Sequence, residues 1–303
     1  MWTCSELKRR AKAVLSRTYW NSFVAVIISV AVFLGVTLVL GVVCVVLTMA
    51  GLLVSGNGFD FVLKNGISGN FYYHSSQIPS ALIPSVVSIY LLSIACSLLI
   101  LMPIKNGVYN FFLSGRAASE RSDYSCIFFA FRDGNYPKVV GAILWGFLWG
   151  VIFSLPITVC DVALSVLPQI VTSFYLRTFF FVFFILLIIP AAVLSIYKSI
   201  CYSMLPFILC DNPKIGFRRA LRMSITMTRG HVGRIFLLGL SFIGWVLLGA
   251  LALGIGVLFV IPYIAATFTE LYAQLRDNVL KSGECAYSEL NFAAPSGGTA
   301  EAN

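Results

Sequence analysis

Long runs of apolar residues, separated by short polar and basic segments, make up most of this chain. The first run extends from Ser22 to Val54 without one charged residue, and a helical membrane crossing needs roughly 20 apolar residues. A signal peptide has an apolar core of only about 7–15 residues, so we expect this run to anchor the chain. The pattern predicts an all-α, polytopic transmembrane helical bundle of about six crossings. The predicted spans are residues 22–50, 82–104, 139–159, 178–197, 235–251 and 253–272.

One short segment decides whether the last apolar stretch forms one span or two. The last two predicted spans form a single apolar stretch that is interrupted only by Gly254-Ile255-Gly256. Glycine at this spacing is compatible with a tight turn or with a flexible point in one long helix. A turn gives six crossings, whereas a continuous helix gives five.

Lys and Arg residues predict the orientation, because loops that are rich in them stay on the cytoplasmic side. With the amino terminus inside, only Lys64 and Arg177 fall outside, and a five-crossing chain would place two more basic residues there. We therefore expect six crossings of the cell membrane, with both termini in the cytoplasm. Residues 1–287 form a single integral membrane domain in this interpretation, and residues 288–303 form a disordered cytoplasmic tail.

The same order of features recurs three times along the chain. Each pair of crossings follows a basic stretch that ends in Arg and a turn-like or aromatic step, and each pair closes on an apolar-Pro step at Pro103, Pro190 or Pro262. Two crossings per copy give every copy the same orientation. We interpret the chain as three parallel repeats of a surface helix plus a helical hairpin.

Two basic amphipathic segments are expected to lie on the cytoplasmic surface of the membrane. Thr3 and Glu6 have the spacing of a capping box, and the segment after them has one apolar face. Asn212, followed by a proline, is expected to cap a second helix that ends at Gly230. The basic residues of both segments are candidates for lipid-headgroup contacts. These candidates are Lys8, Arg9, Lys12, Arg218, Arg219, Arg222 and Arg229.

Composition supports a lipid environment. Apolar residues make up 59% and charged residues 11% of the chain, whereas soluble domains have roughly 45–50% and about 25%. The net charge of +9 comes from basic residues that flank apolar runs, which predicts membrane lipids and no nucleic acid as partners. The eight cysteines form no Cys-x-x-Cys pair and only His74 and His231 are histidines, so we expect no metal site.

No Asp, Glu, His, Lys or Arg lies near the centre of a predicted span, although proton-coupled carriers, ion pumps and intramembrane proteases need one there. Asp161, Arg177 and Lys198 fall at span ends, where snorkelling to the interface explains them. The chain also lacks a phosphate-binding glycine loop and a Gly-x-Ser-x-Gly elbow. We therefore predict no catalytic residues, no cofactor and no enzymatic activity.

Small residues mark helix faces that allow close approach of another helix. Gly146 and Gly150 form a GxxxG pair in the third span, which is compatible with packing inside the chain, with a protein partner or with a homo-oligomer. Ser241, Gly244 and Trp245 are predicted to line a small polar pocket or to serve in helix packing. An interface anchor is the alternative for Trp245.

The run Leu209 to Pro213 and the segment Leu240 to Trp245 resemble the bacterial domain-of-unknown-function family 975. Weaker agreement at Tyr19-Trp20 and in the middle of the chain extends the resemblance over most of its length. The family implies an uncharacterised multi-pass bacterial membrane protein, without an activity, cofactor or substrate to carry over. Pro190-Ala191 departs from the family's usual Pro-Gly step, so a kink there depends on the proline alone.

Two classes of function follow. The first is a non-enzymatic assembly, regulatory or lipid-interacting factor of the bacterial cytoplasmic membrane, which the basic amphipathic helices indicate. The second is a carrier or channel for an apolar or amphipathic solute. A central cavity would favour this second class, and its expected lining is Ser88, Ser93, Ser241 and Trp245.

A lipid-modifying enzyme is a third class. It would require Asp211, His231 and Arg229 to converge on one cytoplasmic pocket.

Overall fold

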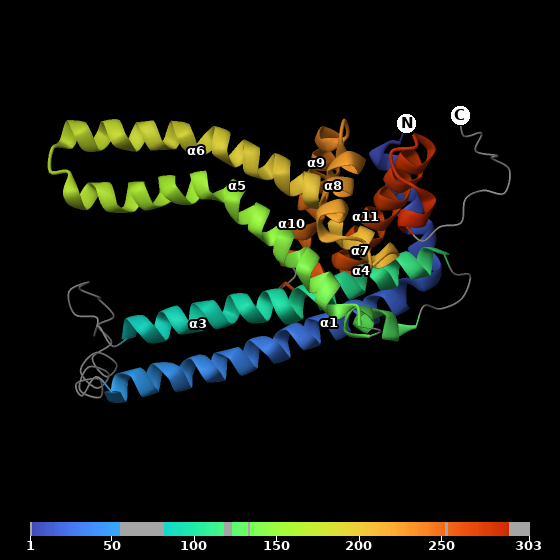
Figure 1. The fold of residues 1–303 in the computed structure, drawn as a ribbon, viewed down its shortest axis with the longest axis horizontal. Helices are drawn as coiled ribbons and strands as arrows, with labels where there is room; N and C mark the ends of the chain where they lie inside the picture. Colours follow the sequence, from blue (N-terminus) through green and yellow to red (C-terminus); the bar gives the residue numbers. More distant parts are fainter. Residues whose placement is uncertain (1, 55–81, 118–122, 133, 252–253, 291–303) are drawn as a thin grey trace. The chain divides into compact units, whose positions relative to one another are not determined.

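The computed structural model describes residues 2–54, 82–117, 123–132, 134–251 and 254–290. These residues are helical nearly throughout and contain no strand (Figure 1). The elements are α1 (Cys4–Val54), α3 (Leu82–Cys96), the π-helical segment η2 (Ser97–Leu101), α4 (Met102–Ala117), the 3-10 helix η3 (Tyr124–Phe131), α5 (Tyr136–Ile170), α6 (Phe174–Tyr202), α7 (Leu205–Asp211), α8 (Phe217–Thr228), α9 (Val232–Leu240), α10 (Ile243–Leu251), α11 (Ile255–Lys281) and the 3-10 helix η4 (Tyr287–Leu290).

Six helical stretches of the described chain are long and apolar enough to cross a membrane. They are Cys4–Ala50, Val86–Arg116, Tyr136–Leu167, Phe174–Asp211, Val232–Leu251 and Ile255–Lys281. Their side chains are largely exposed, and a surface of this composition is stable only in lipid. The predicted class, an all-α multi-pass membrane protein, is confirmed.

The chain divides into two compact units. The smaller unit, residues 27–102, consists of the second half of α1 together with α3 and η2. Most of its described side chains are exposed. The larger unit combines residues 1–26 with 103–303 and holds the remaining elements.

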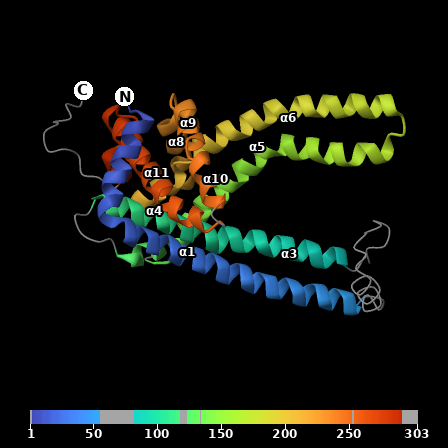
Figure 2. The same cartoon turned by 180° about the vertical axis from the view of Figure 1, so that it is seen from behind.

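The larger unit is built around a helical bundle, from which one long hairpin extends. We use the term core bundle for residues 4–26 of α1 together with α4, α7, α8 and α11. Leu7, Ile208, Met223 and Leu275 are among its fully buried side chains. Helices α5 and α6 pack against each other and run side by side in both views (Figure 1 and Figure 2).

One glycine lets α4 approach η3 closely. A Cβ atom on Gly107 would lie only 1.7 Å from the carbonyl oxygen of Ile127. Because a side chain cannot fit at that distance, glycine is required at this contact between α4 and η3.

The turn between the last two spans is confirmed. Helix α10 ends at Leu251 and α11 begins at Ile255. Gly254 precedes α11 in the left-handed conformation, with a φ of 77°, which favours glycine. A Cβ on Gly249 would lie 2.7 Å from the backbone nitrogen of Val257, so the two helices pack closely beside the turn.

The amino-terminal predictions hold in part. The Glu6 N–H donates a hydrogen bond to Thr3 Oγ1 at 3.3 Å, as predicted for the cap. The basic segment and the first span are not separate elements, however, because α1 continues from Cys4 to Val54.

The predicted cap at Asn212 was wrong. Asn212 ends α7, and its side-chain oxygen accepts a hydrogen bond from the Lys214 N–H at 2.9 Å. This contact forms a turn, and α8 begins only after Gly216. Gly230 follows the end of α8 with a φ of 75°, as predicted.

The tail predicted from residue 288 begins with an ordered segment. Residues Ser288 to Leu290 belong to η4, and Leu290 is fully buried. The remaining tail residues, 291–303, lie outside the described residues, as do residues 55–81 between the first two predicted spans.

Candidate functional site

Helix α8 carries a basic face that is our first candidate for a functional surface. Its apolar side packs against α5, α6, α7 and α11. Arg218, Arg222 and Arg229 are exposed, and their spacing of four and seven residues places them on one side of the helix. Ile225, 37% exposed, lies between them. None of the three forms an ion pair with a described acidic residue, so their charge faces outward.

Aromatic side chains of α5 continue this face. The Arg218 guanidinium lies 5.3 Å from the ring centre of Trp145. Trp145 contacts Trp149 one turn further along, with 6.2 Å between ring centres. Tryptophan is typical of membrane interfaces, because its ring is apolar and its N–H is polar. The combination of Arg and Trp is therefore suited to the headgroup level of a bilayer.

The basic residues predicted on the first helix lie in a different environment. The Lys8 ammonium lies 4.7 Å from the ring centre of Phe242, and the Lys12 ammonium lies 5.7 Å from that of Tyr263. Each cation is stabilised by the negative face of the ring. Arg9 is exposed. Two of these three candidates thus already have partners within the fold.

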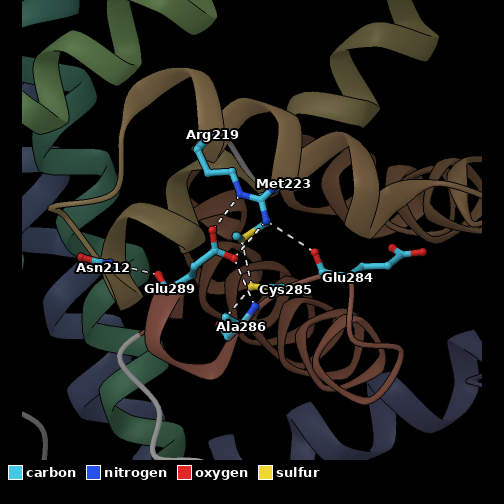
Figure 3. Close-up of polar contacts among 7 residues, drawn as sticks. All are labelled: Asn212, Arg219, Met223, Glu284, Cys285, Ala286 and Glu289. Atoms are coloured by element: carbon cyan, nitrogen blue, oxygen red, sulfur yellow. Dashed lines mark hydrogen bonds and ion pairs between the residues drawn. The ribbon is translucent and has the colours of Figure 1, made fainter. Parts of the chain in front are cut away.

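Arg219 is held by a carboxyl-terminal segment (Figure 3). Its guanidinium donates two hydrogen bonds to the Glu289 carboxylate, at 2.8 and 2.9 Å. The Asn212 amide donates to the Glu289 carbonyl oxygen at 2.9 Å, and the Ala286 N–H donates to the carboxylate at 3.1 Å. We call residues 284–290 the clasp. Arg219, predicted as a headgroup contact, instead ties the clasp to α8.

The clasp predicts a pH dependence of stability. The Arg219 guanidinium lowers the pKa of Glu289 from 4.5 to about 2. Because the folded pKa lies below the unfolded one, the ion pair adds stability above pH 4.5, and this stability is lost as the pH falls toward 2. Glu289→Gln should cost about 0.5–1 kcal/mol near neutral pH, since the two side chains are 41% and 30% exposed.

Thermal unfolding in mild detergent between pH 2.5 and pH 7 measures this difference. The difference in unfolding temperature between wild type and Glu289→Gln should disappear as the pH falls. Arg222→Gln, which removes an exposed charge from the same helix, should show no such difference. The same difference in unfolding temperature at every pH would show that the Arg219–Glu289 ion pair does not cause the pH dependence.

Two ion pairs with buried carboxylates join α11 to other helices, and the sequence alone indicated neither. Arg116 of α4 donates to Glu270 at 2.9 Å, with the Glu270 side chain 7% exposed. On another side of α11, one oxygen of Asp211 accepts from the Tyr272 hydroxyl at 2.6 Å and from Arg276 at 3.1 Å. Glu270 was visible as the one acidic residue of the predicted span 253–272. The sequence does not show that Arg116, 154 positions away, is its ion-pair partner.

A small pocket adjoins the Arg116 and Glu270 pair. Helices α1, α4 and α11 line it, and Thr18, Asn21 and Ser22 supply further polar groups. Its interior has room for about one water molecule. A space of this size beside the ion pair can hold a water molecule.

The residues predicted to form a polar pocket face outward. Ser241 and Gly244 are exposed, and Trp245 is 52% exposed. The Ser241 hydroxyl donates to the Leu238 carbonyl within its own helical segment. In the described chain, these residues do not line the pocket between α1, α4 and α11.

The three residues of the lipid-modifying hypothesis have separate partners. Asp211 contacts Tyr272 and Arg276, whereas the His231 ring lies 5.8 Å from that of Trp2. Burial and the nearby Arg234 lower the pKa of His231, which favours the neutral imidazole. Arg229 is exposed at the end of α8.

Comparison with known protein families agrees with the resemblance seen in the sequence. The family described as "Protein of unknown function (DUF975)" matches residues 1–279. The chain belongs to this family. No curated protein and no solved structure matches the chain. Membership of the DUF975 family covers both units and nearly the whole described fold.

In this member of the DUF975 family, the described residues contain no group of three or more His, Cys, Asp or Glu side chains that could hold a metal ion. The eight cysteines are free thiols.

Proposed function

We propose that this protein is a non-enzymatic assembly, regulatory or lipid-interacting factor of the bacterial cytoplasmic membrane, and that its α8 face binds anionic lipid headgroups. The observation that carries this proposal is the exposed row of Arg218, Arg222 and Arg229 on a helix packed against the membrane-spanning hairpin α5–α6. Arg is suited to this role because its planar group forms paired hydrogen bonds with phosphate.

The surroundings of the row support a position at the membrane surface. Trp145 and Phe217 lie 5.3 Å apart, and the Arg218 guanidinium lies over both rings. Apolar rings beside exposed cations resemble the composition of interfacial helices, where the rings enter the acyl boundary and the cations reach phosphates. Each such cation near an anionic surface contributes about 1 kcal/mol.

Lipid retention tests the proposal. The purified protein is equilibrated with mixed phosphatidylglycerol and phosphatidylcholine in nanodiscs, and the retained lipids are measured by native mass spectrometry. The double variant Arg222→Gln/Arg229→Gln should reduce the preference for phosphatidylglycerol about ten- to thirtyfold. Arg132→Gln/Lys281→Gln removes two exposed charges elsewhere and should leave the preference unchanged. An equal loss in both variants would show general charge attraction and contradict a site on α8.

A further inference from the structure

The pocket between α1, α4 and α11 contains polar groups that the fold leaves without partners. Ser22 lines it and is only 3% exposed, and its hydroxyl forms no hydrogen bond with any described residue. Asn21 also lines the pocket, and its amide likewise has no partner in the described part of the chain. Buried polar groups are normally hydrogen-bonded. The pocket therefore offers hydrogen bonds to an occupant.

Three other side chains of the pocket can only accept further hydrogen bonds. The Thr18 hydroxyl donates to the Val14 carbonyl at 3.0 Å, and the Thr269 hydroxyl donates to the Ala265 carbonyl at 2.9 Å. A hydroxyl whose proton is used in this way retains only its acceptor capacity, and the ionised carboxylate of Glu270 has no proton to donate. The pocket thus favours an occupant that supplies hydrogen-bond donors.

The two charged groups of the pocket are not equally deep. The Glu270 side chain is 7% exposed, whereas that of Arg116 is 31% exposed. Arg116 donates to Oε1 of Glu270 at 2.9 Å, and no described residue donates to Oε2. A cation is therefore favoured inside the pocket beside the carboxylate, and an anion is favoured outside it beside the guanidinium. This order of charges matches a zwitterion.

The size of the pocket limits which cation can enter. Its interior has room for about one water molecule. A primary ammonium group is similar in size to water and carries three N–H donors. A trimethylammonium group is larger and has no N–H donor. The pocket therefore favours a primary ammonium over a choline headgroup.

The pocket lies at the edge of the predicted apolar layer. Ser22 is the first residue of the uncharged run that ends at Val54, and Glu270 lies near the end of the predicted span 253–272. Trp20, two residues before Ser22, is 70% exposed, as is typical of aromatic anchors at the membrane interface. Lipid headgroups occupy this level of a bilayer, so a lipid is the source of the ammonium.

We propose that this pocket binds the primary ammonium of a phosphatidylethanolamine headgroup, with the lipid phosphate beside Arg116. In this arrangement the ammonium donates to the Glu270 carboxylate and to the Ser22 hydroxyl. It replaces the hydrogen bonds that a water would donate, and its charge strengthens them. The site is independent of the α8 face, because it lies on other helices and selects a zwitterionic headgroup.

Lipid competition tests this site. The full-length protein is equilibrated in nanodiscs that contain equal amounts of phosphatidylethanolamine and phosphatidylcholine, and the retained lipids are measured by native mass spectrometry. Wild type should prefer phosphatidylethanolamine about tenfold. The N-methyl and N,N-dimethyl derivatives should be retained progressively less, because each methyl group replaces an N–H donor and enlarges the headgroup.

Two substitutions alter the pocket itself. Thr269→Val replaces an acceptor by a methyl group of similar size and should reduce the preference about three- to tenfold. Ser22→Val fills the space and should abolish the preference. Thr267→Val is the matched control, because Thr267 is also buried on α11 and donates to the Tyr263 carbonyl at 2.8 Å, but does not line the pocket. This control should keep the wild-type preference.

Three outcomes would overturn the proposal. Equal retention of the two lipids by wild type would leave water as the occupant, and equal losses in Thr269→Val and Thr267→Val would show an effect outside the pocket. Tight binding of glycerophosphoethanolamine by the protein in pure phosphatidylcholine nanodiscs would assign the pocket to a soluble amine. Arg222→Gln/Arg229→Gln should keep the preference for phosphatidylethanolamine, so this test and that of the α8 face can fail separately.

Discussion

Gly107→Ala should lower the free energy of unfolding by about 3 kcal/mol or more. The added methyl would lie 1.7 Å from the Ile127 carbonyl oxygen. A flexible side chain could move aside, but here the obstacle is backbone, so α4 and η3 must separate. Val108 and Phe111 of α4 are buried beside this contact, and their packing would be disturbed too.

Thermal unfolding in mild detergent, followed by tryptophan fluorescence, measures this effect. Gly141→Ala is the matched control, because Gly141 lies inside α5 and a Cβ there would meet nothing within 4 Å. This control should be neutral or stabilising by up to about 1 kcal/mol, since alanine has the higher helix propensity. Equal effects of the two substitutions would show that the approach of η3 to α4 does not limit stability.

Asp211→Ala should also lower the free energy of unfolding, by about 3–5 kcal/mol. The Asp211 and Arg276 side chains are only 7% and 9% exposed. Removing the carboxylate leaves the Arg276 charge buried without its main counter-charge. Tyr272→Phe, which removes one hydrogen bond to the same oxygen, should cost less, about 1.5–3 kcal/mol.

A double variant separates charge burial from packing. Asp211→Asn/Arg276→Met removes both charges and should recover much of the stability lost in Asp211→Ala. Unfolding temperatures of the four proteins, in the same detergent, provide the comparison. If the double variant is as unstable as Asp211→Ala, the loss comes from packing and the ion-pair explanation is wrong.

Local patterns were sufficient to predict the apolar helices and the number of candidate crossings. An uncharged run such as Ser22 to Val54 can be predicted to span the bilayer from the local sequence alone, because this depends only on the length of the apolar run. The turn at Gly254 is equally local, since a left-handed residue is needed there and glycine adopts that conformation without strain. Gly230 ends α8 for the same reason.

Features that depend on distant residues could not be predicted in this way. Arg218, Arg219 and Arg222 look alike in the sequence, but only Arg219 turns toward Glu289, 70 positions away. The partners Arg116 and Glu270 are separated by 154 positions. Asn212 followed by proline fits both a helix cap and a turn, and packing of the clasp on its side chain favours the turn.

The buried core of the larger unit joins the two ends of the described chain. Trp2 and Leu7 belong to the same apolar cluster as Cys285 and Leu290. Synthesis proceeds from the amino terminus, so this cluster lacks its last members until the final hairpin has left the ribosome. The helical hairpins, whose contacts are local, can insert into the membrane earlier. We therefore expect the hairpins to insert first and the core to close last, after residues 285–290 have been synthesised.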